Sequence, residues 1–155
     1  ERNKLLDAPR QYSLLQNHKH LPEIQKICGL NNAPIFCPIV ADYYCGMEVT
    51  VPVHKTELNG SVENLSEIYE NYYRDGVIHF SKNENENENE NGFLSANFFA
   101  GRDDMEIKIA GNDERILLIA RFDNLGKGAS GAAVQNMNLV IGTDEFKGLN
   151  LIRNA

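Results

Sequence analysis

The sequence is poor in features that mark several large classes of protein. Basic residues are a minority, with 15 Lys and Arg against 22 Asp and Glu, and the formal net charge is −7. A nucleic-acid groove needs clustered Lys and Arg to displace counterions, so this balance argues against a nucleic-acid partner. No apolar run approaches the roughly 18 residues that span a bilayer. We therefore expect neither a nucleic acid nor a membrane as a partner.

Cysteine is scarce as well, with three residues at irregular spacing: Cys28, Cys37 and Cys45. An odd number of cysteines makes a poor disulfide framework, and reduced thiols are typical of the cytosol. Residues 1–4 lack the apolar stretch of a signal peptide. We therefore expect a cytoplasmic protein. Because the sequence does not start with Met, we also expect an excerpt from a longer chain.

The length and composition are those of an ordinary globular domain. The chain has 155 residues, of which 42% are apolar and 24% charged, so we expect 1–155 to form a single domain. The segment 83–91 alternates Asn and Glu and has no apolar side chain to bury, which predicts a mobile surface loop. Its oxygens could bind a metal, but no spaced ligand pattern supports that interpretation. We predict no metal site.

Periodicity predicts an α+β fold. The predicted strands are 12–15, 35–40, 47–54, 77–80, 105–109 and 115–122, and the predicted helices are 22–28, 61–74 and 131–141. Strands that follow one another without a helix imply a mixed, mostly antiparallel sheet with helices packed on one face. The strand 47–54 alternates between apolar and polar side chains, which is typical of a half-buried strand. We expect its apolar face to form a subunit interface.

Two histidines immediately before a predicted helix are the first candidate for chemistry. His18 and His20 precede Pro22, and Glu23 lies in the first turn. A carboxylate beside an imidazole fixes the tautomer and raises the basicity of the ring, as a general acid/base requires. The alternative is a pair of surface histidines beside a capping Glu. On composition alone, that alternative is favoured.

The second candidate is a glycine-rich segment, 123–138, that joins a predicted strand to a helix. Glycines let a backbone approach a ligand closely, and helix N-termini offer free N–H groups to anions. The order G-x-x-x-x-G-K-[ST] of a P-loop is absent. A tight turn in which small residues allow close packing is an equally good interpretation.

Taken together, these segments resemble those of N-acetyl-gamma-glutamyl-phosphate reductases. The matching segments are 18–24, 34–40 leading to Gly46 and Met47, 123–138, and the stretch ending at Gly148 and Leu149. Aspartate-semialdehyde dehydrogenases carry a segment similar to 123–138. The combination with H-x-H-x-P-E-I separates the two families. The resemblance covers nearly the whole chain apart from 83–91.

The resemblance implies the α+β catalytic and dimerisation domain of an NADPH-dependent reductase of arginine biosynthesis. Such an enzyme converts N-acetyl-glutamyl phosphate to N-acetyl-glutamate semialdehyde through a Cys thiolate. The resemblance implies that the chain corresponds to the C-terminal domain, without the Rossmann domain that binds NADP. The nucleophilic Cys is expected upstream, so the isolated segment is expected to be inactive. Cys28 and Cys37 are expected to be buried apolar side chains.

The resemblance also implies roles for individual residues. His18 is expected to be the acid/base partner of the thiolate, with Glu23 orienting it and His20 as the alternative. The residues expected at the nicotinamide side of NADP or at the substrate phosphate are Lys127, Gly128, Gly131 and Gln135. The cations that could bind the substrate carboxylate are Lys19, Arg102 and Arg121. Many family members carry Arg where this chain has Cys45, so the choice stays open.

The expected partners are the acyl phosphate, the chain's own N-terminal Rossmann domain and further subunits in a dimer or tetramer. Two other functions remain open. One is an aspartate-semialdehyde dehydrogenase-like domain, which would reduce a shorter acyl phosphate. The other is a dimerisation module without catalysis.

Overall fold

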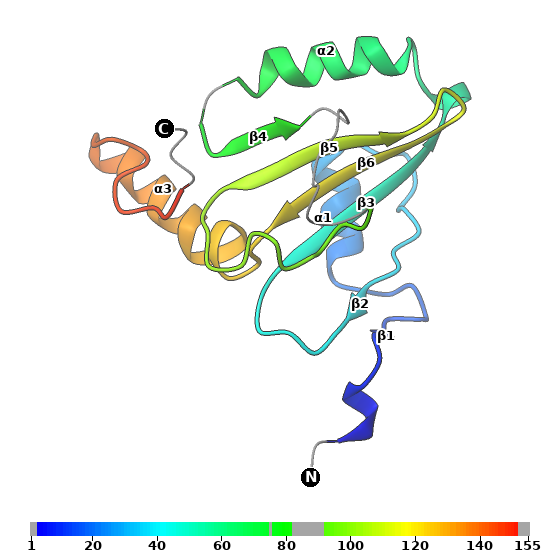
Figure 1. Cartoon of the computed structure of the whole chain (residues 1–155), viewed down its shortest axis with the longest axis horizontal. Coiled ribbons are helices and arrows are strands. Elements are labelled where there is room, and N and C mark those ends of the chain that lie inside the picture. The colour runs from blue at the N-terminus through cyan, green and yellow to red at the C-terminus, as the bar shows by residue number, and fades with distance from the viewer. Residues whose placement is uncertain (1–2, 75, 82–91, 152–155) are drawn as a thin grey trace. The chain divides into compact units, whose positions relative to one another are not determined.

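The computed structural model describes residues 3–74, 76–81 and 92–151 (Figure 1). Backbone contacts divide the chain into two compact units, Glu1–Tyr44 and Cys45–Ala155, and each is described by itself. The segment predicted as an Asn-Glu loop, 83–91, lies outside the described residues. Among the helices of the described ranges, none is long and apolar enough to cross a membrane.

The first unit contains little regular structure. It has a short 3-10 turn at Lys4–Leu6, a helix α1 at His20–Ile27, and two short strands, β1 at Arg10–Gln11 and β2 at Ile39–Val40. The two strands pair antiparallel. Of the described residues 3–44, only Leu21 is buried. This unit therefore has almost no apolar core of its own.

Two strand predictions in the first unit fail for one physical reason. The strand predicted at 12–15 is wrong, because the chain turns there and Gln16 adopts a positive φ of 54°. Of the strand predicted at 35–40, only Ile39–Val40 pairs. The Gln16 amide donates to the Phe36 carbonyl (2.7 Å) and accepts from the Phe36 N–H (2.9 Å). The Gln16 side chain thus takes up the Phe36 backbone groups that a neighbouring strand was expected to bond.

The second unit is built on a four-stranded sheet with the order β3-β6-β5-β4. Its strands are β3 at Met47–His54, β4 at Ile78–Ser81, β5 at Met105–Gly111 and β6 at Arg115–Phe122. The β3–β6 and β5–β6 pairs are antiparallel, and the β4–β5 pair is parallel. The predicted mixed, mostly antiparallel sheet is confirmed. β3 lies at an edge, where its Pro52, which lacks an N–H, is tolerated.

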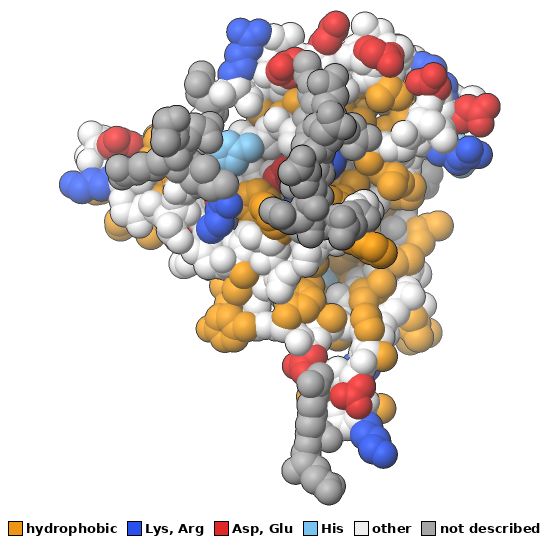
Figure 2. All heavy atoms as spheres, in the orientation of Figure 1, with side chains coloured by type: hydrophobic (Ala, Val, Ile, Leu, Met, Phe, Trp, Pro, Cys, Tyr) orange, Lys and Arg blue, Asp and Glu red, His pale blue; other side chains and the backbone are white. Residues whose placement is uncertain are grey.

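Helix α2, at Val62–Tyr72, lies on one face of this sheet (Figure 1). The hydroxyl of Ser61 accepts from the N–H of Asn64 (3.2 Å), and the Asn64 side chain accepts from the N–H of Ser61 (3.2 Å), so a reciprocal cap starts the helix. The Tyr69 ring contacts the Phe80 ring of β4, with 5.8 Å between centroids. Acidic side chains gather along the outer side of α2 (Figure 2): Glu63, Glu67 and Glu70.

The face of the sheet that α2 covers is apolar, and only part of it is covered. The register aligns Phe80 with Ile107, and Ile107 with Ala120 and then Val49, so these side chains share one face. At the β3 edge the apolar side chains stay accessible: Met47 is 39%, Val49 43% and Val51 49% exposed. The strand 47–54 is confirmed, but its apolar side is not buried as expected, since Met47, Val49 and Val51 are exposed and Glu48 is less so.

The predicted helix after β6 is also confirmed. A π-helical turn at Gly126–Ser130 leads directly into α3 at Gly131–Ile141. Gly142 ends the helix at a φ of 71°, a left-handed conformation that glycine adopts without strain. These elements confirm the α+β fold class.

Candidate functional site

His18 is held by contacts within the first unit. Its Nδ1 accepts a hydrogen bond from the N–H of His20 (3.2 Å). The His18 ring lies 5.0 Å from the ring of Phe36 and 5.7 Å from that of Tyr12, measured between centroids. The side chain is half-buried. Because Nδ1 accepts, Nε2 is the nitrogen that carries the proton in the neutral ring.

The other predicted residues of this segment are exposed. The His20 ring lies 4.7 Å from the His18 ring at the start of α1. Glu23 is in the first turn of α1, but within the described residues 3–44 its carboxylate makes no hydrogen bond to either imidazole. Lys19 is exposed and flanks the helix start. The backbone of His20, rather than Glu23, therefore orients the His18 ring in this structure.

The first part of the glycine-rich segment 123–138, which we call the glycine-rich turn, is organised by the buried carboxylate of Asp123. It accepts from the N–H groups of Gly101 (2.5 Å), Leu125 (2.7 Å) and Gly126 (3.1 Å). Burial alone would raise the pKa of Asp123, but these bonds and one from the Cys45 thiol outweigh it and lower the pKa. The sequence interpretation missed this role, although an Asp directly after a buried strand and before a glycine turn is a usable signal.

Two glycines of the turn are explained by contacts inside the chain. A β-carbon at position 126 would collide with the backbone carbonyl of Arg102, and one at position 131 with the Asp103 carboxylate. Asp103 is in turn fixed by the N–H of Asn150, which donates to its Oδ2 (2.8 Å). Gly131 is buried, so the geometry favours a packing role for it. Gly128 is exposed, and its N–H donates to the Asp123 carbonyl (2.8 Å).

Lys127 and Gln135 are brought together by the step from the π-helical turn into α3. The Lys127 Nζ donates to the Gln135 Oε1 (3.0 Å), and both side chains are half-buried. The ammonium therefore lies at the glycine-rich turn, next to the N-terminal end of α3. An ammonium at such a turn can hold an anion such as a phosphate.

The two candidate arginines are engaged on the polar face of the sheet. Arg121 is 1% exposed, pairs with Glu106 (2.7 Å), and lies over the ring of Phe98 at 4.7 Å. Arg102 pairs with the fully buried Asp104. Breaking a buried pair leaves an uncompensated charge, so the geometry favours structural roles for both arginines. Lys19 is the exposed candidate of the three.

The cysteines differ from expectation. Cys28 and Cys37 are exposed, so the prediction that they are buried apolar side chains is wrong. The unit that carries them buries almost nothing, which is why apolar neighbours in the sequence do not enclose them. Cys45 is half-buried. Its hydrogen bond to the Asp123 carboxylate, with some desolvation, raises the pKa of this thiol, which makes it a poor nucleophile at neutral pH.

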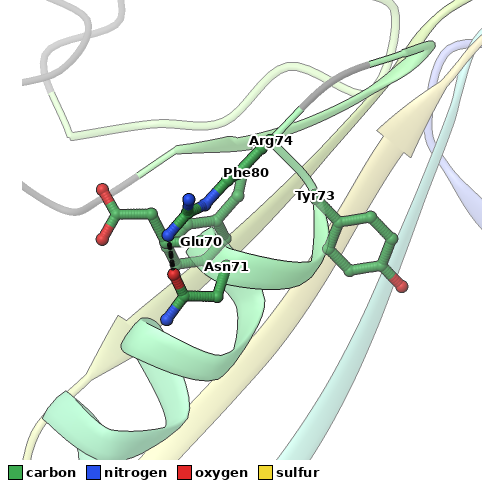
Figure 3. A pocket seen from close by; sticks show the side chains of 5 residues that line it. All are labelled: Glu70, Asn71, Tyr73, Arg74 and Phe80. Carbon is green, nitrogen blue, oxygen red and sulfur yellow. Dashed lines mark hydrogen bonds between the residues drawn. The ribbon is translucent and has the colours of Figure 1, made fainter.

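A surface pocket lies elsewhere, between the end of α2 and β4 (Figure 3). Its lining residues are Glu70, Asn71, Tyr73, Arg74 and Phe80. Arg74 donates to the Asn71 side chain there. None of the predicted site residues lines this pocket. Among the described residues, no group of three or more His, Cys, Asp or Glu is placed to hold a metal ion.

The fold is one found in semialdehyde dehydrogenases. A solved structure of aspartate semialdehyde dehydrogenase II from Vibrio cholerae is similar, with a TM-score of 0.55 and 21% sequence identity over 79% of this chain and 35% of that one. At this level of identity, the similarity shows a shared fold and nothing about the substrate.

The family model of the semialdehyde dehydrogenase dimerisation domain matches residues 1–124, and the chain belongs to this family. The match crosses the boundary between the two units, and the single domain remains a prediction. A reductase named N-acetyl-gamma-glutamyl-phosphate reductase 2, from a Nostoc species, is 37% identical over 89% of this chain. An N-acetyl-gamma-glutamyl-phosphate reductase from Brucella ovis is 39% identical over 84%. The resemblance found in the sequence is thereby confirmed. The chain spans 45% and 43% of these relatives, respectively.

Proposed function

We propose that this chain is the C-terminal catalytic and dimerisation part of an NADPH-dependent N-acetyl-gamma-glutamyl-phosphate reductase in the cytoplasm. The observation that carries the proposal is the similarity to two such reductases over 84–89% of the chain. The geometry of His18 and of the glycine-rich turn agrees with it. The reaction reduces an acyl phosphate to an aldehyde, with the nucleophilic thiolate and the Rossmann domain supplied by the length that this chain does not span.

His18 is the proposed acid/base residue. Its Nδ1 is occupied by the N–H of His20, so Nε2 is the atom that faces a reacting group. Nε2–H can hydrogen-bond to a thiolate and then stabilise the oxygen that develops charge when the thioester is reduced. His20 remains the alternative because its ring is adjacent and exposed. We propose that Glu23 acts on the helix N-terminus and on the local charge.

The reacting end of NADPH is proposed to lie at the glycine-rich turn. When bound, the cofactor supplies the hydride. The residues present fit a phosphorylated ligand, because the half-buried Lys127 ammonium lies at the turn and Gly128 is accessible. Lys127, Gly128 and Gln135 would contact the cofactor or the phosphate of the substrate, while Gly131 keeps the turn closed against Asp103.

The substrate carboxylate needs a cation that is free to bind it. Lys19 is exposed and next to His18 in the sequence, whereas both arginines are held in ion pairs with buried or half-buried carboxylates. We therefore propose Lys19 as the first choice. Arg102 is the second, because part of its guanidinium remains accessible.

The open edge of the apolar face is the proposed dimer surface. Met47, Val49 and Val51 stand on β3 and are each about two-fifths to one-half exposed. Apolar side chains that gather on one strand are typical of an interface, and a stable one buries more than roughly 1,000 Å². We expect Val49→Asp to shift a dimer towards monomers in analytical ultracentrifugation. Thr50→Asp on the opposite face is the matched control.

The direct test is the activity of the full-length protein. NADPH oxidation should be measured with N-acetyl-glutamyl phosphate and with aspartyl phosphate. Activity with the first substrate is the expected result. Activity with only the second would establish the dehydrogenase alternative, and no activity with either would favour a dimerisation module.

A further inference from the structure

The turn that follows α3 folds back along the helix. Gly142 takes a left-handed conformation, and the N–H of Thr143 donates to the carbonyl of Asn138 (3.0 Å). The buried Asn138 side chain then donates to the carbonyls of Glu145 (3.1 Å) and Lys147 (2.9 Å). One amide therefore fixes the backbone of the returning turn, and with it the place of Glu145.

The returning turn links the Glu145 carboxylate to Lys127 of the glycine-rich turn through one side chain, that of Gln135. The Gln135 Nε2 donates to the Glu145 Oε2 (3.3 Å), and the Gln135 Oε1 accepts from the Lys127 Nζ (3.0 Å). All three side chains are half-buried. They form a chain of hydrogen bonds from a carboxylate to an ammonium, which we term the Lys127–Gln135–Glu145 relay.

The chemistry of the relay allows one orientation of the central amide. An ionised carboxylate only accepts and an ammonium only donates. The Gln135 amide must therefore turn its NH₂ to Glu145 and its oxygen to Lys127, and both bonds are charge-assisted. A Gln at position 145 can donate as well as accept, so it no longer fixes the Gln135 amide in this orientation, and the reversed amide would present its NH₂ to the ammonium and release Lys127.

The place of the Lys127 ammonium explains why Glu145 matters. Lys127 lies within the π-helical turn Gly126–Ser130 that runs into α3, and the Asp123 carboxylate already accepts from the N–H groups at the start of this turn. The Glu145 carboxylate, acting through Gln135, keeps the ammonium beside the turn when no ligand is bound. Holding a flexible lysine in advance reduces the entropy lost on binding.

We propose that Glu145 is a positioning residue that acts through Gln135 to hold the Lys127 ammonium ready for a phosphate group at the glycine-rich turn. The inference rests on the proposed function, since the phosphate would belong to NADPH or to the acyl phosphate. Glu145 itself does not touch the ligand.

The test compares Glu145→Gln with wild type in the full-length protein. We expect the KM for one of the two phosphorylated ligands to rise about tenfold, with kcat and the melting temperature nearly unchanged. Which KM rises identifies the source of the phosphate. Glu145→Asp should recover part of the loss. Glu67→Gln, which removes the same charge from exposed α2, should leave both KM values unchanged.

A double-mutant cycle with Lys127→Met shows whether Glu145 acts through the lysine. If it does, adding Glu145→Gln to Lys127→Met raises KM no further. Additive effects, or wild-type KM values in Glu145→Gln, would overturn the proposal while leaving the reductase assignment intact.

Calorimetry with inorganic phosphate distinguishes a failure of the proposed reductase function from a failure of the relay. A protein that binds phosphate but reduces neither acyl phosphate would refute the proposed function. In that case, about tenfold weaker phosphate binding by Glu145→Gln would still support the relay, and unchanged binding would overturn it.

Discussion

The histidine segment and the glycine-rich turn hold their key side chains in different ways. Around Asp123, three backbone N–H groups converge on one buried carboxylate, and Gly126 and Gly131 leave no room for a β-carbon. Around His18, one backbone N–H and two aromatic rings hold a half-buried ring in a unit with almost no core.

From this difference we infer that Asp123 contributes mainly to stability and His18 mainly to acid/base chemistry. Buried charge-assisted bonds and close backbone contacts make the turn costly to alter. A ring held by a few contacts at the surface can be replaced with little loss of folding energy. We therefore expect changes at His18 to reduce turnover and changes at Asp123 to reduce stability.

The largest expected effect is on turnover. His18→Asn in the full-length reductase should lower kcat by about 10²–10⁴, as the loss of a general acid/base does, with less than about 1 kcal/mol lost in unfolding free energy. Steady-state kinetics and urea unfolding measure the two quantities. His20→Asn is the matched control and should retain most activity. The reverse ranking would move the role to His20.

The next effect is on folding. Asp123→Asn keeps one acceptor oxygen but puts an NH₂ in place of the other, facing either the Gly101 N–H or those of Leu125 and Gly126. The unfolding free energy should therefore fall by about 2–4 kcal/mol at neutral pH. Denaturant unfolding of the full-length protein measures it. Asp113→Asn, at an exposed site between β5 and β6, is the control. Equal stability of the two variants would contradict the scaffold role of the turn.

The same carboxylate predicts an acid limit to stability. The pKa of Asp123 is lowered in the folded protein, because its hydrogen bonds outweigh the effect of burial. Its contribution is therefore complete above the unfolded pKa of about 3.9 and is lost as the pH falls through the lower folded pKa. The loss of stability in acid should be smaller in Asp123→Asn than in wild type. Parallel profiles would exclude this source.

Substitutions at two glycines, one in each region, should differ in their cost to stability. A β-carbon at Gly131 would collide with the Asp103 carboxylate. A β-carbon at Gly29, after α1, would have no atom within 4 Å, and its only cost would be the positive φ of 63°. We expect Gly131→Ala to cost about 1–3 kcal/mol and Gly29→Ala about 1 kcal/mol. Thermal unfolding of both variants provides the ranking. A larger loss at Gly29 would contradict it.

The smallest effect is on thiol reactivity. Cys28 and Cys37 are exposed, whereas the bond to Asp123 raises the pKa of Cys45. A maleimide at neutral pH should therefore modify Cys28 and Cys37 before Cys45, because the thiolate is the reactive form. Peptide mass spectrometry over time gives the order. Fast modification of Cys45 would show that the thiol is not held by Asp123.

The sequence predicts the second unit well and the first unit poorly. The strands Met47–His54 and Arg115–Phe122 and the helix Gly131–Ile141 have periodic apolar patterns, and their bounds are correct. In the first unit, the Gln16 side chain bonds the backbone of Phe36, 20 residues further along the chain, where strand pairing was expected. No local pattern reports such a bond.

The candidate site shows the same limit. The histidine pair and the glycine-rich turn were found from residue types and spacing. The partners that hold them were not, because the Asp103 carboxylate against Gly131 and the Glu145 carboxylate on Gln135 depend on how the chain folds back. The expected orienting role of Glu23 was inferred from proximity in sequence, whereas the structure gives the bond to the His20 backbone.

The first unit holds His18 so that Nε2 is the nitrogen that carries the proton in the neutral ring. NMR of the full-length protein with isotope-labelled histidine measures the tautomer directly, since the two ring nitrogens differ in chemical shift. When the ring is neutral, we expect the proton on Nε2 and a bonded, unprotonated Nδ1. A proton on Nδ1 would contradict it.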